Sequence, residues 1–305
     1  MMKTRNQLFK LSAALLVSAG VLASCTDNEN VAGKGKASVY LTDAPIDAEN
    51  VTGVYISVMG VELNGPNGWV TVSSFEEPKS LNLLDYQNGE SYFLADQTMD
   101  AGVYSEARLI LDITEKSESS RNVTPGCYLE FANGEVQPLF VPSGSQSGYK
   151  AKGDFTISAN STTDVIIDFD VRKAVVEAGN SGQYILKPVL RLVSNENIGN
   201  INGTINSSLT NYSKVVVFIY ENDTFTEAEL ETTDSSNGFD NAVSSALVNE
   251  AGEFTLAFIN QGTYDLYFVA YDQEGSSLSL IGEQQDVEVK AQTDTEISLE
   301  LEISL

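Results

Sequence analysis

The sequence predicts an all-β protein with two β-sandwich domains behind an N-terminal signal segment. Two observations predict this class. Short stretches in which apolar and polar residues alternate, separated by turn residues, recur along most of the chain, whereas helical periodicity is scarce. The length of 305 residues is also sufficient for two domains of ordinary size.

The first 24 residues have the parts of a secretory signal peptide in the right order. Basic residues precede an apolar stretch, residues 11–22, which is shorter than the roughly 20 residues of a spanning helix. The closing residues Leu22-Ala23-Ser24-Cys25 resemble a bacterial lipobox. The resemblance implies that residues 1–24 are removed as a lipoprotein signal peptide and that the thiol of Cys25 is the site of lipid attachment.

Residues 25–35 are expected to form a short polar tether. Its segment Asp27-Asn28-Glu29-Asn30 is similar to the acidic tags that send lipoproteins of Bacteroidetes to the outside of the outer membrane. The resemblance implies an outer-membrane lipoprotein, exposed at the cell surface and attached to the membrane through acylated Cys25. A plain solvated tether is the alternative interpretation of the same residues.

The net charge of −26 and the absence of histidine limit the function classes. A field of this sign repels nucleic acid, so none is expected as a partner. Without histidine, Ser-His-Asp and Cys-His nucleophilic systems and imidazole-based zinc sites are excluded. With Cys25 acylated, Cys127 has no disulfide partner and is expected to be a small residue at a strand start.

The first sandwich is expected over residues 36–193. Val54, Ile56 and Val58 alternate with residues that face the other way, which indicates a half-buried strand. Asn133-Gly134 predicts a type I′ hairpin turn, and Pro188 predicts a sheet edge or a bulge. The expected strands are 37–42, 54–58, 69–72, 108–113, 128–131, 136–141, 155–157, 164–170 and 184–192, with short helical turns at 81–86 and 172–177.

A polar linker at 194–200 is expected to separate a smaller sandwich at 201–305. Residues 221–245 are acidic and rich in Ser and Thr, which predicts a long solvated loop. The strands expected around it are 201–205, 214–220, 253–258, 264–271, 286–290 and 295–301.

Each predicted sandwich contains a glycine followed two residues later by a tyrosine at a strand start. These tyrosines are Tyr104, after Gly102, and Tyr264, after Gly262. Glycine permits a tight turn, and a tyrosine at this place can hydrogen-bond back across a sandwich corner. Both tyrosines are therefore expected to serve folding and not ligand binding.

Seven segments in order resemble a bacterial lipoprotein domain, the domain-of-unknown-function family 4382, over about residues 36–193. They are Leu-Thr-Asp-Ala-Pro at 41–45 with Asp47, Gly-Trp at 68–69, Leu-Leu-Asp at 83–85, Ala-Gly-Val-Tyr at 101–104 with Arg108-Leu109, Pro-Ser-Gly-Ser-Gln-Ser-Gly at 142–148, Asp-Phe-Asp at 168–170 and Leu-Lys-Pro at 186–188. This resemblance implies no activity.

The second unit resembles the carboxypeptidase-regulatory and transthyretin-like sandwiches through two short segments. They are Asn-Glu-Ala-Gly-Glu-Phe at 249–254 and Gly-Thr-Tyr at 262–264. This resemblance implies a non-catalytic stalk or accessory binding module. Both domains are thus expected to have immunoglobulin-like or transthyretin-like architecture.

Two pairs of carboxylates are the candidate metal ligands. Asp43 and Asp47 follow a predicted strand, and Asp168 and Asp170 project from one face of another strand. If the pairs converged, their oxygens would suit calcium, which takes 6–8 oxygen ligands. The alternative is that the first pair caps turns and the second pair meets Arg172, Lys173 or Arg108. No other cofactor is expected.

The loop at 142–148 and nearby aromatic residues are the candidate ligand-binding elements. Glycines bring backbone N–H groups close to a ligand, and Ser and Gln side chains supply donors and acceptors. Aromatic rings near turns can stack on sugars. The candidate ligand-binding residues are Ser143, Gly144, Gln146, Tyr149 and Trp69. A flexible hairpin end and core aromatic residues are the alternatives.

These observations together predict a non-catalytic, lipid-anchored surface protein. Its first domain would bind an extracellular glycan or protein in an adhesion role, with the second domain as a spacer. The alternative is a fimbrial subunit that assembles by strand donation, with residues 295–301 as the donated strand. A third function class is a hydrolase with an unidentified pair of carboxylates, and no catalytic residue is assigned.

Overall fold

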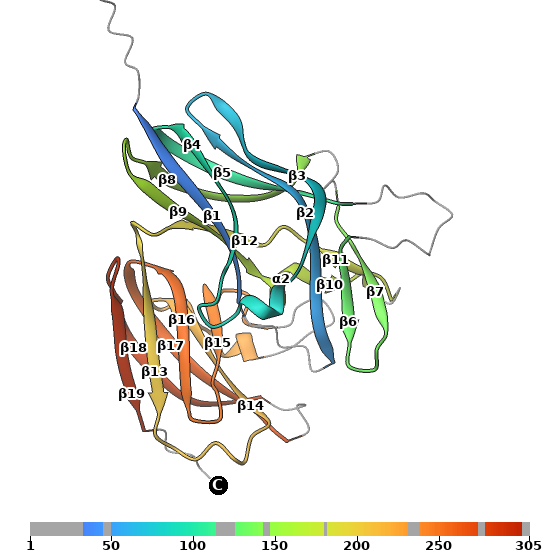
Figure 1. Cartoon of the computed structure of the whole chain (residues 1–305). Coiled ribbons are helices and arrows are strands. Elements are labelled where there is room, and N and C mark those ends of the chain that lie inside the picture. The colour runs from blue at the N-terminus through green and yellow to red at the C-terminus, as the bar shows by residue number, and fades with distance from the viewer. Residues whose placement is uncertain are drawn as a thin grey trace, which may run out of the picture. The chain divides into compact units, whose positions relative to one another are not determined.

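The computed structural model describes residues 33–44, 50–113, 126–142, 147–179, 182–230, 238–273 and 278–300. These residues belong to one compact unit, Ala32–Leu305 (Figure 1). The unit is almost entirely β-structure, as the sequence predicts. Its strands form a twelve-stranded sheet, a three-stranded sheet and a four-stranded sheet.

The twelve-stranded sheet contains every described strand before residue 195. Its order is β10-β11-β7-β6-β2-β5-β8-β12-β9-β1-β4, and β3 pairs with β2 off this path. The strands are β1 (Lys34–Ala44), β2 (Val51–Gly65), β3 (Gly68–Asn82), β4 (Tyr92–Asp100), β5 (Gly102–Leu111), β6 (Tyr128–Phe131), β7 (Val136–Phe140), β8 (Tyr149–Ile157), β9 (Thr162–Asp170), β10 (Val175–Glu177), β11 (Tyr184–Leu186) and β12 (Leu190–Ser194). Two short helices, η1 (Leu83–Tyr86) and α2 (Val171–Ala174), lie at the predicted helical turns.

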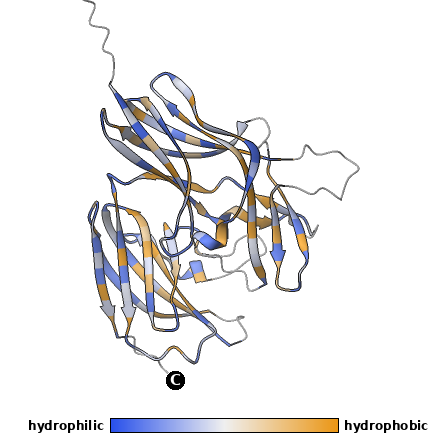
Figure 2. Cartoon of the chain, viewed as in Figure 1, coloured by the Kyte–Doolittle hydropathy of each residue, from blue (hydrophilic) through white to orange (hydrophobic). Residues whose placement is uncertain are grey.

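Alternation of apolar residues builds the core of this sheet. Val54, Ile56 and Val58 are fully buried, and Figure 2 shows apolar and polar residues alternating along the strands. Strand β4 is absent from the predicted strands because its sequence does not alternate regularly. It is the last strand of the order, and among the described strands it pairs with β1 alone, across a register shift at Val39/Tyr40.

The Asn133-Gly134 turn and the predicted strand 184–192 each differ from prediction in one detail. Gly134 has a positive φ of 80°, but Asn133 is not among the residues with positive φ, so the turn is not type I′. The predicted strand 184–192 is divided into β11 and β12 at residues 187–189. Pro188 lacks an N–H for the ladder, which explains the break and agrees with the predicted irregularity.

The smaller sheets contain the strands from β13 onward. The three-stranded sheet has the order β16-β13-β19, and the four-stranded sheet has the order β15-β14-β17-β18. The strands are β13 (Ile198–Ile205), β14 (Lys214–Glu221), β15 (Ser244–Leu247), β16 (Glu253–Asn260), β17 (Gly262–Tyr271), β18 (Leu278–Val289) and β19 (Asp294–Leu299). Ile201 and Leu256 of one sheet share a core with Val217 and Leu266 of the other, as in a sandwich.

The prediction of a solvated loop at 221–245 agrees with the exposed residues 221–224 and 226–228 but is wrong for Glu229, Phe239 and Ala242, which are buried. Six consecutive residues of β14 are buried, so both faces of this strand need cover. The second face packs against Phe225, Leu230, Phe239 and Ala242, and the helix η3 (Glu227–Leu230) lies in the same segment. The unbroken apolar run Val-Val-Val-Phe-Ile-Tyr at 215–220 is the sequence signal for this cover.

The two corner tyrosines take the predicted role. Tyr104 donates its hydroxyl hydrogen to the carbonyl of Asp100 at 2.9 Å, and Tyr264 donates to the carbonyl of Asn260 at 3.0 Å. Both bonds join a tyrosine to the fourth residue before it. The rings are buried, since Tyr104 is 1% and Tyr264 is 7% exposed.

Replacing either corner tyrosine by phenylalanine is expected to lower the free energy of unfolding by about 1 kcal/mol. The ring remains in place, but the carbonyl of Asp100 or Asn260 loses its donor. Urea denaturation of Tyr104→Phe and Tyr264→Phe measures the effect. Unchanged stability in both variants would show that the corner hydroxyls contribute nothing.

Candidate functional site

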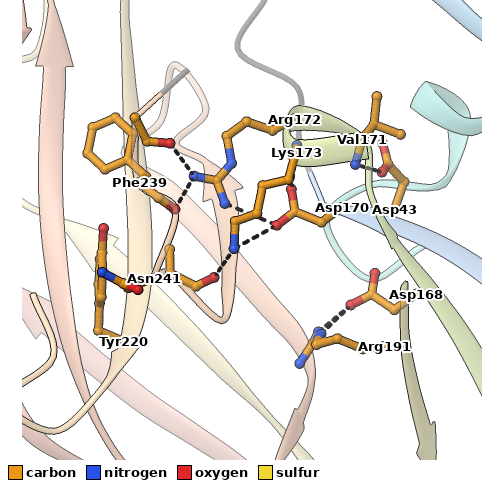
Figure 3. Close-up of polar contacts among 12 residues, drawn as sticks. Asp43, Asp168, Asp170, Val171, Arg172, Lys173, Arg191, Tyr220, Phe239 and Asn241 are labelled. Carbon is orange, nitrogen blue, oxygen red and sulfur yellow. Dashed lines mark hydrogen bonds and ion pairs between the residues drawn. The ribbon is translucent and has the colours of Figure 1, made fainter. Parts of the chain in front are cut away.

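A cluster of buried charged side chains lies where β9 ends and α2 begins (Figure 3). Strand β1 runs parallel to β9, with Asp43 opposite Phe169, and this pairing brings Asp43 beside Asp168 and Asp170. The exposed fractions are 4% for Asp43 and Asp168 and 7% for Asp170. The calcium hypothesis requires the two pairs of carboxylates to converge, and the structure places Asp43, Asp168 and Asp170 at neighbouring positions of β1 and β9.

Arg172 connects this cluster to the segment before β15. One guanidinium nitrogen donates to the carbonyl of Phe239 at 2.8 Å, and the other contacts Asp170 Oδ2 at 3.1 Å. The guanidinium lies 5.2 Å from the ring centroid of Phe218, and Arg172 is 2% exposed. Arg172 therefore links the twelve-stranded sheet to the segment that covers the four-stranded sheet.

Lys173 contacts the same segment before β15 as Arg172 does. Its ammonium donates to the carbonyl of Ala242 at 2.6 Å and lies 3.2 Å from Asp170 Oδ2. Asp170 also caps α2, since its Oδ1 accepts from the backbone N–H of Lys173 at 3.3 Å. Burial raises the pKa of Asp170, but Arg172 and Lys173 outweigh burial and hold that pKa below its ordinary value. Burial also lowers the pKa of Lys173 against the attraction of Asp170.

The covering segment is itself fixed by a buried carboxylate, Glu229. Its oxygens accept from the Tyr220 hydroxyl at 3.2 Å, from the backbone N–H of Asn241 at 3.0 Å and from the Asn241 side-chain amide at 2.6 Å. Burial and the adjacent Glu229 raise the pKa of Tyr220. These bonds hold in place the carbonyls that Arg172 and Lys173 contact.

The remaining two carboxylates of the cluster have other partners. Asp168 accepts hydrogen bonds from the guanidinium of Arg191, with its Nε at 2.8 Å. Asp43 accepts from the Gln87 amide and from the Val171 backbone N–H, each at 3.2 Å. Burial raises the pKa of Asp168 despite Arg191, and it raises the pKa of Asp43 well above its ordinary value.

These contacts favour the alternative to a calcium site. The predicted pairing of Asp170 with Arg172 and Lys173 is present, and Asp168 is paired with Arg191. Within the described ranges, no group of three His, Cys, Asp or Glu side chains is arranged to hold a metal ion. Asp47 lies outside those ranges, so the site with four carboxylates stays a prediction.

Two of the five candidate ligand-binding residues, Tyr149 and Trp69, belong to the part of the chain that the structure describes. Ser143, Gly144 and Gln146 lie outside the described residues. Tyr149 belongs to the core, contrary to its assignment as a ligand residue: it is 2% exposed, stacks on Phe169 at 5.7 Å and donates its hydroxyl hydrogen to the carbonyl of Lys187. Its position in β8 turns the ring inward, and burial raises its pKa.

Trp69 is half-buried and packs against the charged side chains of Arg108 and Lys150. The guanidinium of Arg108 is 4.3 Å and the ammonium of Lys150 is 5.3 Å from its ring centroid. Arg108 is also paired with Glu62, which accepts from the Thr71 hydroxyl at 3.2 Å. Cation–π contacts therefore engage the indole, and these contacts explain Trp69 without a ligand.

A cavity of about 530 Å³ lies elsewhere, at the end of the β6–β7 hairpin. Aromatic rings of Phe131 and Tyr184 stand 5.8 Å apart at its wall, inclined by 52°. Glu135 is held between two amides, with Gln137 Nε2 at 2.5 Å and Asn133 Nδ2 at 3.5 Å. The described lining residues are Asn50, Phe131, Asn133, Glu135, Gln137, Gly182 and Tyr184.

The sequence contains part of the signal for this cavity. Glu135 and Gln137 follow the Asn133-Gly134 turn at alternate positions, so they share a face of the hairpin. Tyr184 is remote in sequence and reaches the wall because β11 pairs in parallel with β7. That pairing could not be predicted from local pattern.

Cys127 is buried at 2% exposure, and burial raises its pKa to about 11. A thiol with this pKa is protonated at neutral pH, which agrees with the expected packing role. Cys25 and residues 1–24 lie outside the described residues. Among the described residues, no helix is long and apolar enough to cross a membrane.

The solved structures that match the chain share little sequence identity with it. The chain is 11% identical to the Bacillus anthracis TIE protein, with 88% of this chain and 34% of that chain covered and a TM-score of 0.21. It is 13% identical to a leucine-rich repeat protein from Bacteroides thetaiotaomicron VPI-5482, with 89% and 26% covered and a TM-score of 0.20. The chain therefore spans about a third of the length of the first protein and about a quarter of the length of the second.

The fimbrial anchor protein Mfa2 from Porphyromonas gingivalis is 10% identical, with 87% of this chain and 90% of that chain covered and a TM-score of 0.21. TM-scores of this size do not establish a common fold. No curated protein matches the chain. One family does match, described as Domain of unknown function (DUF4382), and its match covers residues 34–188, just over half of the 305-residue chain. The chain therefore belongs to the DUF4382 family.

Proposed function

We propose that this protein is a non-catalytic, lipid-anchored protein of the cell surface that binds a neutral glycan in the cavity lined by Phe131 and Tyr184. The observation that carries the proposal is the lining of that cavity. A sugar ring presents apolar C–H faces and a rim of hydroxyl groups. Aromatic rings match the faces, and the amides and carboxylate of Asn133, Gln137 and Glu135 match the hydroxyl groups.

The size and organisation of the cavity support the same ligand. Small-molecule sites typically have volumes of about 300–1,000 Å³, and this cavity has about 530 Å³. The amide of Gln137 donates a hydrogen bond to the exposed Glu135 carboxylate, so an acceptor for a sugar hydroxyl group stands at the cavity. The negative charge of Glu135 disfavours acidic sugars, so neutral oligosaccharides are the expected class.

The hydrolase alternative needs two carboxylates flanking the scissile bond. Among the described lining residues, Glu135 is the single carboxylate. The proposal therefore assigns binding, and adhesion as its consequence at the surface.

Replacing Tyr184 by alanine is expected to weaken glycan binding about tenfold, because one stacking surface is lost. The measurement is binding of the purified protein, from Thr26 onward, to an array of neutral oligosaccharides. Tyr92→Ala is the matched control: Tyr92 is also a half-buried tyrosine with an aromatic neighbour, Tyr86, but it lies in β4 outside the cavity. Silence of the wild-type protein on the array, or equal loss in both variants, would contradict glycan binding at this site.

The surface location is tested with intact cells, a glycan identified on the array and a protease. Intact cells that carry the full chain are expected to bind a glycan identified on the array. A protease that cannot cross the outer membrane should remove both the protein and this binding. Protection of the protein from the protease would place it inside the envelope and contradict an adhesion role.

A further inference from the structure

Strands β18 and β19 are edges of the two smaller sheets. Among the described strands, β18 pairs with β17 alone and β19 pairs with β13 alone (Figure 1). The turn between them is closed by side chains: Thr293 donates to the Lys290 carbonyl at 2.9 Å, and Thr295 donates to the Glu288 carbonyl at 3.0 Å. The two edges are therefore held together at one end.

A groove of about 680 Å³ follows these edges. Its apolar part includes Val287, which belongs to the buried core, and Ile297, which packs against that core. Its polar part includes Asp286, Glu288 and Asp294. Edge strands present unpaired backbone N–H and C=O groups, and an extended chain can add to them as a further strand. The groove therefore has the backbone and the apolar floor that strand addition requires.

The charge of the groove selects the occupant. Among the described residues, three carboxylates and one ammonium, Lys290, line it, and Lys290 is paired with Glu288 at 3.1 Å. The whole chain carries a net charge of −26, so a second copy would meet repulsion at this edge. We infer that the groove binds an extended, basic polypeptide segment of a partner protein, in which apolar and Lys or Arg residues alternate. This site is separate from the glycan cavity.

The edge of β18 also limits the length of the added strand. The pairing of β18 with β17 shifts register between Tyr264 and Leu266, and Asp286 has a positive φ of 58°. A bulge of this kind interrupts an edge and opposes pairing of two long strands. Because the Glu288 carbonyl already accepts from Thr295, the edge that remains for a short added segment is that of β19, at residues 294–299.

The test uses a fluorescent eight-residue peptide of alternating Lys and Val and the protein from Thr26 onward. Fluorescence anisotropy is expected to show saturable binding that weakens at least tenfold with a Glu-Val peptide. A Lys-Val peptide that is N-methylated at alternate backbone nitrogens keeps all its side chains but lacks the N–H groups for strand addition, and it should also bind at least tenfold more weakly. Equal binding of the N-methylated peptide would indicate nonspecific charge attraction and overturn the proposal.

The variant Glu288→Gln/Asp294→Asn should weaken the Lys-Val peptide about tenfold. The control Asp96→Asn/Asp100→Asn removes the same charge from exposed residues of β4 and should leave binding unchanged. The proposal would be overturned if the two variants lost peptide affinity equally or if the wild-type protein showed no saturable binding. It would also be overturned if copies of the protein associated with one another and displaced the peptide. Because the glycan array reports on another site, failure of either proposal leaves the other testable.

Discussion

Replacing Arg172 by alanine is expected to lower the free energy of unfolding by about 3–5 kcal/mol, because a buried pair is broken by removal of one partner. Asp170 would keep only Lys173 as a cationic neighbour within the cluster, and the Phe239 carbonyl would lose its 2.8 Å donor. The packing of the guanidinium on Phe218 would also be lost. Urea denaturation measures the change.

The control is Lys36→Ala, which breaks a pair with Asp96 at 2.6 Å. Those side chains are 44% and 41% exposed, so the expected loss is about 0–1 kcal/mol. Hydrogen exchange gives a second readout. In Arg172→Ala the backbone amides of Phe239 and Ala242 should exchange faster, whereas those of β2 should not. Similar losses of stability in both variants would show that Arg172 does not link the covering segment to the large sheet.

Replacing Asp43 by asparagine is expected to flatten the dependence of stability on pH. Burial raises the pKa of Asp43 well above its ordinary value of 3.8, against the hydrogen bonds from Gln87 and Val171, and Asp168 and Asp170 add to the rise. The folded protein therefore keeps a proton that the unfolded chain has released. Stability falls as pH rises from about 4 through the folded pKa, by about 1.4 kcal/mol for each pH unit that separates the folded pKa from the unfolded pKa.

Other carboxylates of the cluster set the remaining slope. The raised pKa of Asp168 acts in the same direction and persists in Asp43→Asn, so the slope is reduced and not abolished. The lowered pKa of Asp170 acts in the opposite direction: its contribution is present above pH 3.8 and is lost as pH falls through the folded pKa.

Urea denaturation between pH 4 and 8 tests this expectation. Asp43→Asn should approach or exceed the wild-type stability at the upper end of the range, where wild-type Asp43 must lose its proton or destabilise the fold. The exposed-site variant Asp96→Asn should follow the wild-type curve. Parallel curves for wild type and Asp43→Asn would contradict a raised pKa.

Much of the secondary structure could be predicted because it depends on local alternation. Residues 54–58 and 108–113 point their apolar side chains to one face whatever pairs with them. The corner tyrosines also follow from short segments, because the donor and the carbonyl that accepts are four residues apart. Strand β4 could not be predicted in this way because an edge strand needs no regular alternation.

The candidate site depends on contacts that the sequence does not encode locally. The spacing of Asp168 and Asp170 places them on one strand, but Arg191 becomes a partner only through the antiparallel pairing of β12 with β9. Phe239 and Ala242 lie in a segment whose composition predicts a solvated loop, although this segment covers β14 and receives Arg172 and Lys173. Proximity to a loop likewise suggests a ligand for Tyr149, whereas its place in β8 turns it into the core.

The all-β class, the family and the corner tyrosines can be recognised without coordinates, since each depends on short local patterns or on the order of short motifs along the chain. Which charges are buried, and with what partners, depends instead on the tertiary fold, because burial and pairing are set by strands that are remote in sequence. The place of the cavity has the same origin, since Phe131 and Tyr184 meet only through the parallel pairing of β7 and β11.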